Sequence, residues 1–195
     1  MKRLFLLSLL LLLTLAACSA RTLLVADVDV LSFVDAADLE GDLTVPGSVQ
    51  VFVPDADGDP LTPDGGQLVD QLPVLDALAG FAVRVTVEVE NTGGGTLQVA
   101  AEFRLAPASD SADIYDGVQD LKLAEAGFQL DPGARRTITL EAELVQGDAG
   151  MELITQEGFR VGMKIAATGA SSVHYRITGF DLQLKQRPFD LIPSG

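Results

Sequence analysis

Apolar and polar residues alternate one by one along residues 81–90. The apolar ones share one face of an extended chain: Phe81, Val83, Val85, Val87 and Val89. This period of two predicts a β-strand with one buried side. Residues 96–105 repeat the pattern with Leu97, Val99, Ala101, Phe103 and Leu105. The loop between them contains Asn91 and three glycines, which tolerate positive φ. The pattern therefore predicts that the two strands form a β-hairpin.

The same alternation predicts further strands at residues 138–144, 159–168 and 173–184. In the last of these the phase slips at Thr178-Gly179, where one extra residue and a glycine predict a β-bulge in a single long strand. Two earlier strands are predicted at Leu23 to Val34 and Ser48 to Val53. The turn Asp131-Pro132-Gly133 precedes Arg135-Arg136, which should begin a solvated strand.

About seven strands with one polar face each favour antiparallel sheets packed face to face. Long amphipathic helices between the strands are missing, which disfavours a parallel α/β fold. We therefore expect an all-β fold, an immunoglobulin-like antiparallel β-sandwich, as one domain over residues 23–195. One or two short helices fit residues 72–80, where Pro73 suits a first turn, and residues 151–157.

The first residues have the three regions of an export signal: Met1-Lys2-Arg3, a leucine-rich run, and small residues. The apolar run through Ala17 has 14 residues and is too short to span a bilayer comfortably. An ordinary cleaved signal or a short anchor would share these features. However, Leu15-Ala16-Ala17-Cys18 resembles the lipobox of bacterial lipoproteins, and Cys18 is the only cysteine in the chain.

This resemblance implies that residues 1–17 are a signal peptide and that Cys18 carries diacylglycerol and an acylated amine. Residues 18–22 would then be a lipidated tether, because two or more acyl chains give stable membrane anchoring. The expected place is the bacterial cell envelope, facing away from the cytoplasm. Ser19 stands where Asp tends to retain lipoproteins on an inner membrane, so the outer membrane is expected if the organism has one.

The charge balance narrows the choice of partners. The chain of 195 residues has 13 Lys plus Arg against 28 Asp plus Glu, a net charge of −15, and the part from Cys18 onward has a net charge of −17. This argues against nucleic acid, which requires clustered cations. The charge also repels anionic lipid headgroups, so we expect the domain to hang from its anchor rather than lie on the membrane.

Three aspartates in Pro54 to Thr62 form the best candidate metal site: Asp55, Asp57 and Asp59. Carboxylates at alternate positions can converge on calcium, which takes six to eight oxygen ligands. The stretch resembles the Asp-x-Asp-Gly-Asp-Pro-Leu-Thr signature of bacterial cadherin-like repeats, where such aspartates help to bind calcium. A second acidic stretch, Asp110, Asp113 and Asp116, would contribute only if the fold brings it near. The alternative is a plain solvated turn.

Catalytic sets are sparse. His174 is the only histidine, and it alternates with inward Val173 and Tyr175, so we expect it to face solvent. Ser171 and Ser172 lack the second glycine of a nucleophile elbow. Carboxylate pairs for a glycosidase remain available among 28 acids, although the chain has no Trp and two Tyr, while sugar sites usually carry aromatic platforms.

The lipobox, the strand beginning at Leu23 and the alternating strand ending at Asn91 also resemble bacterial lipoproteins of the water-stress and hypersensitive-response group. The likeness covers roughly Leu23 to Val145, and it departs from the group's Asn-Pro-Asn at Asn91-Thr92-Gly93. It implies a late-embryogenesis-type β-sandwich with a protective or structural role and no cofactor.

Three functions follow in order of preference. The first is a non-catalytic envelope lipoprotein that binds another envelope protein through strand edges or loops such as Asp55 to Gly66 and requires no cofactor. The second is a calcium-stabilised adhesion or ligand-binding module. The third is a carboxylate-based hydrolase.

Overall fold

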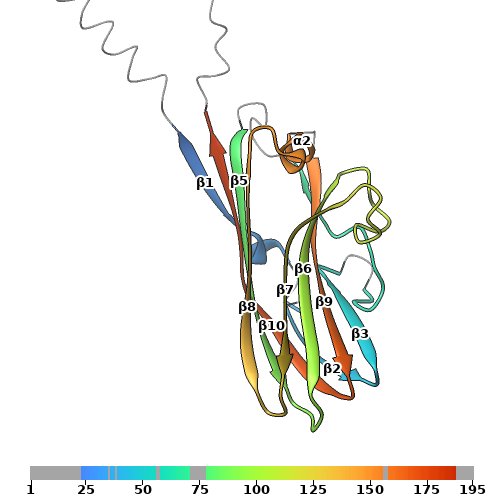
Figure 1. Ribbon diagram of the computed structural model, residues 1–195. Coiled ribbons are helices and arrows are strands. Elements are labelled where there is room, and N and C mark those ends of the chain that lie inside the picture. Colours follow the sequence, from blue (N-terminus) through green and yellow to red (C-terminus); the bar gives the residue numbers. More distant parts are fainter. Residues whose placement is uncertain are drawn as a thin grey trace, which may run out of the picture.

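The computed structural model describes residues 23–187 apart from positions 35, 38, 56–57, 71–77 and 156–157. Two antiparallel sheets face each other in it (Figure 1). One, sheet A, has the order β1-β10-β5-β8, with β2 also paired to β10. Its strands are β1 (Leu24–Asp29), β2 (Glu40–Val45), β5 (Leu78–Asn91), β8 (Arg135–Val145) and β10 (Ser171–Gln186).

The other, sheet B, has the order β3-β9-β6-β7, with β4 also paired to β9. Its strands are β3 (Ser48–Val53), β4 (Gln67–Asp70), β6 (Leu97–Pro107), β7 (Leu121–Leu130) and β9 (Gly158–Gly169).

The strands pair in a nested order: the first strands in the sequence pair with the last, and the pairing continues toward the middle of the chain. β1 and β2 pair with β10, β3 and β4 with β9, β5 with β8, and β6 with β7. This is the connectivity of a jelly roll, a sandwich made of two Greek keys. The predicted all-β antiparallel sandwich is confirmed, with a jelly-roll strand order in place of the expected immunoglobulin-like one. The nesting places the start of β1 beside the end of β10.

The predicted hairpin of residues 81–90 and 96–105 is wrong, although both strands exist. β5 lies in sheet A and β6 in sheet B, so residues 92–96 carry the chain across the sandwich. A one-sided apolar pattern is the same whether the next strand lies beside its predecessor or faces it. In both strands the apolar side chains point into one shared core, where Phe81, Val85, Leu97 and Phe103 are almost fully buried.

Other predicted elements are confirmed. β3 covers Ser48–Val53 as expected, β8 begins at exposed Arg135, and β9 covers the predicted 159–168. β10 is one strand whose register with β5 shifts between Ile177 and Gly179. Thr178 is the extra residue, and the bulge keeps Ile177 and Phe180 both in the core. The predicted turns near 151–157 correspond to α2 (Ala149–Ile154).

Some predicted boundaries are wrong. The first strand ends at Asp29, and a 3-10 helix (Val30–Phe33) follows it. There the Asp29 carboxylate accepts the N–H of Leu31 at 3.0 Å, which starts the turn. Of the predicted helix at 72–80, residues 78–80 belong to β5, and residues 71–77 lie outside the described part. The strands β2, β4 and β7 were not predicted.

Aromatic side chains join the two sheets across the core. Phe81 of sheet A meets Phe159 of sheet B edge-on, with ring centroids 6.0 Å apart. Phe103 of sheet B meets Phe180 of sheet A in the same way at 5.6 Å. Each pair adds to the burial of apolar surface that holds the sandwich closed.

Asn91, at the end of β5, is fully buried and links three loops. Its Nδ2 donates to the carbonyls of Gly95 and Leu130 at 2.7 and 3.0 Å. Its Oδ1 accepts the N–H of Gly93 at 3.1 Å and the hydroxyl of Ser171 at 2.7 Å. Every side-chain polar atom of this amide thus has a partner, as a buried amide requires.

We expect Asn91→Ala to destabilise the fold by about 2–4 kcal/mol, because it removes four hydrogen bonds and leaves buried partners unsatisfied. Urea unfolding at pH 7 would measure the change in unfolding free energy. Thr92→Ala, at the exposed neighbouring position, is the control and should stay within about 0.5 kcal/mol of the wild type. Equal stability of the two variants would contradict the role given to Asn91.

Candidate functional site

The predicted site residues are only partly within the described structure. Cys18 and Asp57 lie outside it. Asp55 Oδ1 accepts the N–H of Gly58 at 2.8 Å, and Asp59 Oδ1 accepts that of Leu61 at 3.1 Å. Both are turn-forming bonds of the kind that aspartate makes with its own loop. Among the described residues, no three His, Cys, Asp or Glu side chains gather closely enough to hold a metal ion. Calcium binding through Asp57 therefore stays a prediction.

The fold brings the second acidic stretch beside the first loop. Arg160 of β9 donates through Nε to the carbonyl of Ala108 at 3.0 Å and through Nη1 to those of Gly65 and Gly66 at 3.1 and 3.2 Å. The N–H of Ile114 donates to the carbonyl of Asp64 at 3.0 Å. One guanidinium thus joins residues 54–66 and 108–120, which we call the acidic loops. Asp64 is the aspartate of the first loop whose backbone takes part in these contacts.

The acidic loops also cover part of sheet B. Tyr115 packs its ring on Phe52, with centroids 4.8 Å apart, and its hydroxyl donates to the carbonyl of Met163 at 3.2 Å. Phe52 points away from the core yet is only 3% exposed. Burial, with Asp64 and Asp113 nearby, raises the pKa of Tyr115 well above its ordinary value, so this phenol stays neutral and acts as a donor.

The carboxyl of Asp110 has a raised pKa, and the residue is 8% exposed. Burial is the main cause, and the negative charges of Asp116, Asp120 and Asp113 add to it. Its Oδ2 is buried without a hydrogen-bond partner.

Asp110 should lower stability at neutral pH. A carboxyl whose pKa is higher in the folded than in the unfolded protein imposes its cost above the folded pKa and none below the unfolded value of 3.8. We expect Asp110→Asn to raise the unfolding free energy at pH 7 by on the order of 1 kcal/mol. The gain should shrink as the pH falls toward 3.8, and urea unfolding across this range would measure it.

Asp131→Asn serves as the control for Asp110→Asn, because it makes the same charge change at an exposed turn. It should lack the pH-dependent gain. A similar gain in both variants would assign the effect to net charge rather than to the burial of Asp110.

Calcium binding by Asp55, Asp57 and Asp59 has its own test. Calcium at a hundred times its Kd should stabilise the folded protein by about 2.7 kcal/mol and raise Tm accordingly. Asp57→Asn should abolish the increase, whereas Asp116→Asn, in the other acidic loop, should keep it. An unchanged Tm in millimolar calcium would remove the calcium site.

His174 and the nearby serines do not form a nucleophilic set. The His174 side chain lies on the outer face of β10, where Nδ1 is 3.0 Å from Asp42 of β2. The hydroxyl of Ser171 donates to Asn91, as described above. The prediction that His174 faces outward is confirmed, with 34% of its side chain exposed.

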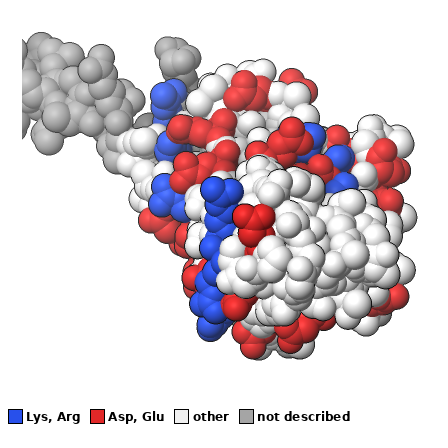
Figure 2. Space-filling model, turned by 60° about the horizontal axis from the view of Figure 1, so that its bottom comes forward, with Lys and Arg blue, Asp and Glu red and all other residues white. Residues whose placement is uncertain are grey.

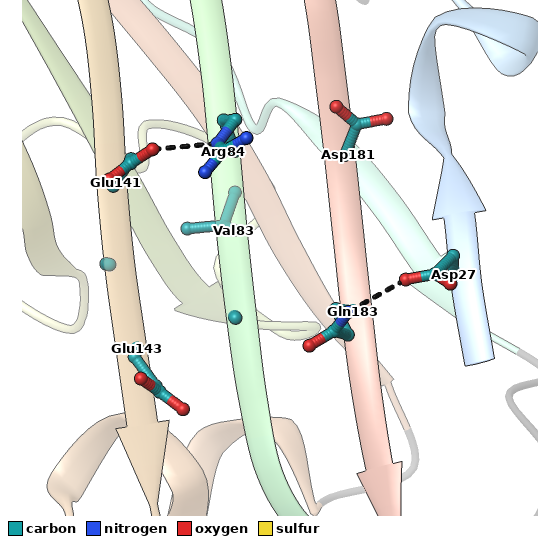
Figure 3. Close-up of a pocket in the computed structure, with 9 residues that line it drawn as sticks. Asp27, Val83, Arg84, Glu141, Glu143, Asp181 and Gln183 are labelled. Atoms are coloured by element: carbon teal, nitrogen blue, oxygen red, sulfur yellow. Dashed lines mark hydrogen bonds and ion pairs between the residues drawn. The ribbon is translucent and has the colours of Figure 1, made fainter. Parts of the chain in front are cut away.

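One hollow lies on the outer face of sheet A, where Ala82 and Ala142 form part of its lining (Figure 3). It has a volume of about 530 Å³ and is lined by four carboxylates and one arginine: Asp27, Glu141, Glu143, Asp181 and Arg84. Arg84 Nε donates to Glu141 at 2.7 Å, with 64% and 58% of the two side chains exposed. Lys185 pairs with Glu143, and Gln183 donates to Asp27 at 3.0 Å. Acids so exposed and paired are poor candidates for proton transfer, which favours low-dielectric surroundings.

The loops at one end of the sandwich are almost without charge. Asp131 is the only charged residue in the connections 46–47, 92–96, 131–134 and 170. We call these four connections the loop end. Figure 2, with this end turned toward the viewer, shows a broad uncharged surface bordered by charged side chains. On a chain with a net charge of −15, such a surface allows close contact with a partner without charge repulsion or the desolvation of ions.

The loop end is also held in one conformation. Besides the bonds of Asn91, the N–H of Thr92 donates to the carbonyl of Ser172, and that of Gly169 to Gly47, at 2.9 and 2.8 Å. A Cβ on Gly93 or Gly95 would overlap residues 170–172, so only glycine allows this close approach. A preordered surface loses little conformational entropy when it binds.

No helix in the described ranges has the length and apolar character needed to cross a membrane.

No protein-family model and no curated protein matches the chain. Among solved structures, the chain is similar to that of infectious bursal disease virus, Gt strain, with 13% identity, a TM-score of 0.46, and coverage of 88% of this chain and 34% of that one. It is also similar to TmCBM61 in complex with β-1,4-galactotriose, with 9% identity, a TM-score of 0.33, and coverage of 84% and 89%. The chain spans about a third of the viral protein's length, and these likenesses concern the sandwich fold alone.

Proposed function

We propose that this chain is a non-catalytic, membrane-anchored lipoprotein of the bacterial envelope whose β-sandwich binds another envelope protein. The observation that carries the proposal is Leu15-Ala16-Ala17-Cys18, which follows a basic start and a leucine run and holds the only cysteine. Thioether-linked lipid on Cys18, together with an acylated amine, gives stable anchoring. The side facing away from the cytoplasm is the proposed location, and the outer membrane where there is one.

The geometry of the sandwich supports this proposal. β1 begins at Leu24, six residues after Cys18. The loop end lies at the far side of the sheets, since β10, with 16 residues, runs from there to the partner of Leu24. At ~3.3 Å per residue, the two ends are about 50 Å apart. An anchored chain would hold the loop end away from the bilayer.

The proposed contact surface is the loop end, because it is uncharged and internally hydrogen-bonded. The acidic loops and the outer face of sheet A carry carboxylates, which keep the protein soluble and repel acidic neighbours. The calcium-stabilised module is the alternative proposal, and the melting experiment with Asp57→Asn distinguishes it.

Lipidation and partner binding are tested on protein extracted from its own membranes. The intact mass should equal residues 18–195 plus diacylglyceryl and acyl groups, and Cys18→Ala should abolish this form. Cross-linked pull-down of the lipidated protein should then recover a small reproducible set of envelope proteins that Cys18→Ala loses.

A matched pair of variants tests the loop end. Ala170→Arg places a charge on it, and Ala112→Arg makes the same change at an exposed position of an acidic loop. We expect the first to reduce partner recovery about tenfold, the equivalent of ~1.4 kcal/mol, and the second to leave it unchanged. Equal recovery with both variants would exclude the loop end as the contact surface.

A further inference from the structure

Exposed large apolar side chains gather where β1 begins. Of the seven such residues in the described part of the chain, four are at this end: Leu23, Leu24, Val25 and Val145. They are 47%, 52%, 44% and 54% exposed. Isolated exposed apolar residues are ordinary, but a group of them at one end of an acidic protein can mark a contact with an apolar phase.

The strand register makes part of this set continuous. Val25 of β1 lies opposite Lys185 of β10, Lys185 opposite Gly80 of β5, and Gly80 opposite Val145 of β8. These four residues form one row across the outer face of sheet A. The Lys185 stem lies over Gly80, since a Cβ there would meet Lys185 Cδ and Cβ at 3.5 and 3.7 Å. The stem therefore places methylene groups between the strands of the two valines. We call these four residues, with Leu23, the apolar row.

The charged groups around the apolar row are mostly paired. Lys185 pairs with Glu143, and Gln183 donates to Asp27, one row farther from the end of the sheet. Asp148 Oδ2 accepts the N–H of Val145 at 2.8 Å. Arg187, which follows β10, is exposed. A lysine or arginine beside apolar side chains suits a lipid interface, because its stem lies along apolar surface while its charged head stays among polar groups. Lys185, paired with Glu143, contributes its stem, and exposed Arg187 contributes a cationic head.

We propose that the apolar row rests on the lipid bilayer interface and fixes the tilt of the domain on its anchor. The inference rests on the proposed lipidation of Cys18. Leu23 is the fifth residue after Cys18, and five residue steps reach at most about 18 Å. The tether therefore keeps the start of the row within about this distance of the anchored sulfur. This proximity favours lipid over a protein partner, and it refines the expectation that the domain only hangs from its anchor.

The test uses the full-length lipidated protein in phosphatidylcholine vesicles doped with phosphatidylcholine that bears a headgroup nitroxide. Val145→Cys carries an environment-sensitive fluorophore. Thr137→Cys is the matched control, because it lies on the same outer face of β8 and is also exposed. Eight residues separate the two positions, about 26 Å along the strand. In lipidated protein the Cys18 sulfur is blocked, so each variant takes one label.

We expect nitroxide lipid to quench the label at position 145 several-fold more than the label at position 137. Adding Val25→Thr, which keeps a β-branched side chain but makes it polar, should reduce that quenching. Equal, weak quenching at both positions in singly labelled, vesicle-bound protein would overturn the docking of the apolar row while leaving the anchor intact. Two labels per chain, with protein absent from the vesicles, would overturn the proposed lipidation instead.

Discussion

Every long strand of this protein has one apolar face, and the fold depends on burying all of these faces at once. Two sheets that face each other meet this requirement, and their side chains interlock through pairs such as Phe81 with Phe159 and Phe103 with Phe180. Nested pairing then assigns each strand to a sheet. The first and last strands, β1 and β10, pair with each other. The described chain therefore begins at one end of the sandwich, and the loop end lies at the other.

Asn91 shows why the turn end can be both uncharged and ordered. Loops of Gly, Ser, Thr and Pro have little apolar surface to bury, so hydrogen bonds must hold them. One buried amide joins Gly95, Leu130, Gly93 and Ser171, and the glycines allow the backbones to approach. An aspartate could not replace it, since a carboxylate has no donors for the two carbonyls.

The sequence predicts features encoded in neighbouring residues, such as strands and bulges, but it does not predict contacts between segments far apart in the chain. The alternation in β5 and β10, and even the bulge at Thr178, could be predicted because a two-residue period is encoded in neighbouring residues. The partner of β5 could not be predicted, because the next strand has the same alternation of apolar and polar residues whether it lies beside β5 or faces it from the other sheet. β7 was missed because its own bulge at Leu123 shifts the phase and because Ala124, Ala126 and Gly127 give a weak apolar signal. Arg160 joins the two acidic loops across more than fifty residues, a contact that no local pattern encodes. The role of Asn91 was missed for the same reason, since an asparagine before glycines has the pattern of an ordinary turn.

The two ends of the sandwich differ in the chemistry that they offer, and this difference is the strongest structural support for a tethered binding module. Near the start of β1, exposed valines and leucines lie beside Lys185 and Arg187, a combination suited to a lipid interface. At the other end, an uncharged and hydrogen-bonded surface is suited to a protein. Many of the carboxylates lie elsewhere, on the outer face of sheet A and in the acidic loops. If Cys18 is anchored as proposed, the apolar row lies near the bilayer and the loop end lies about 50 Å along the sheet from it.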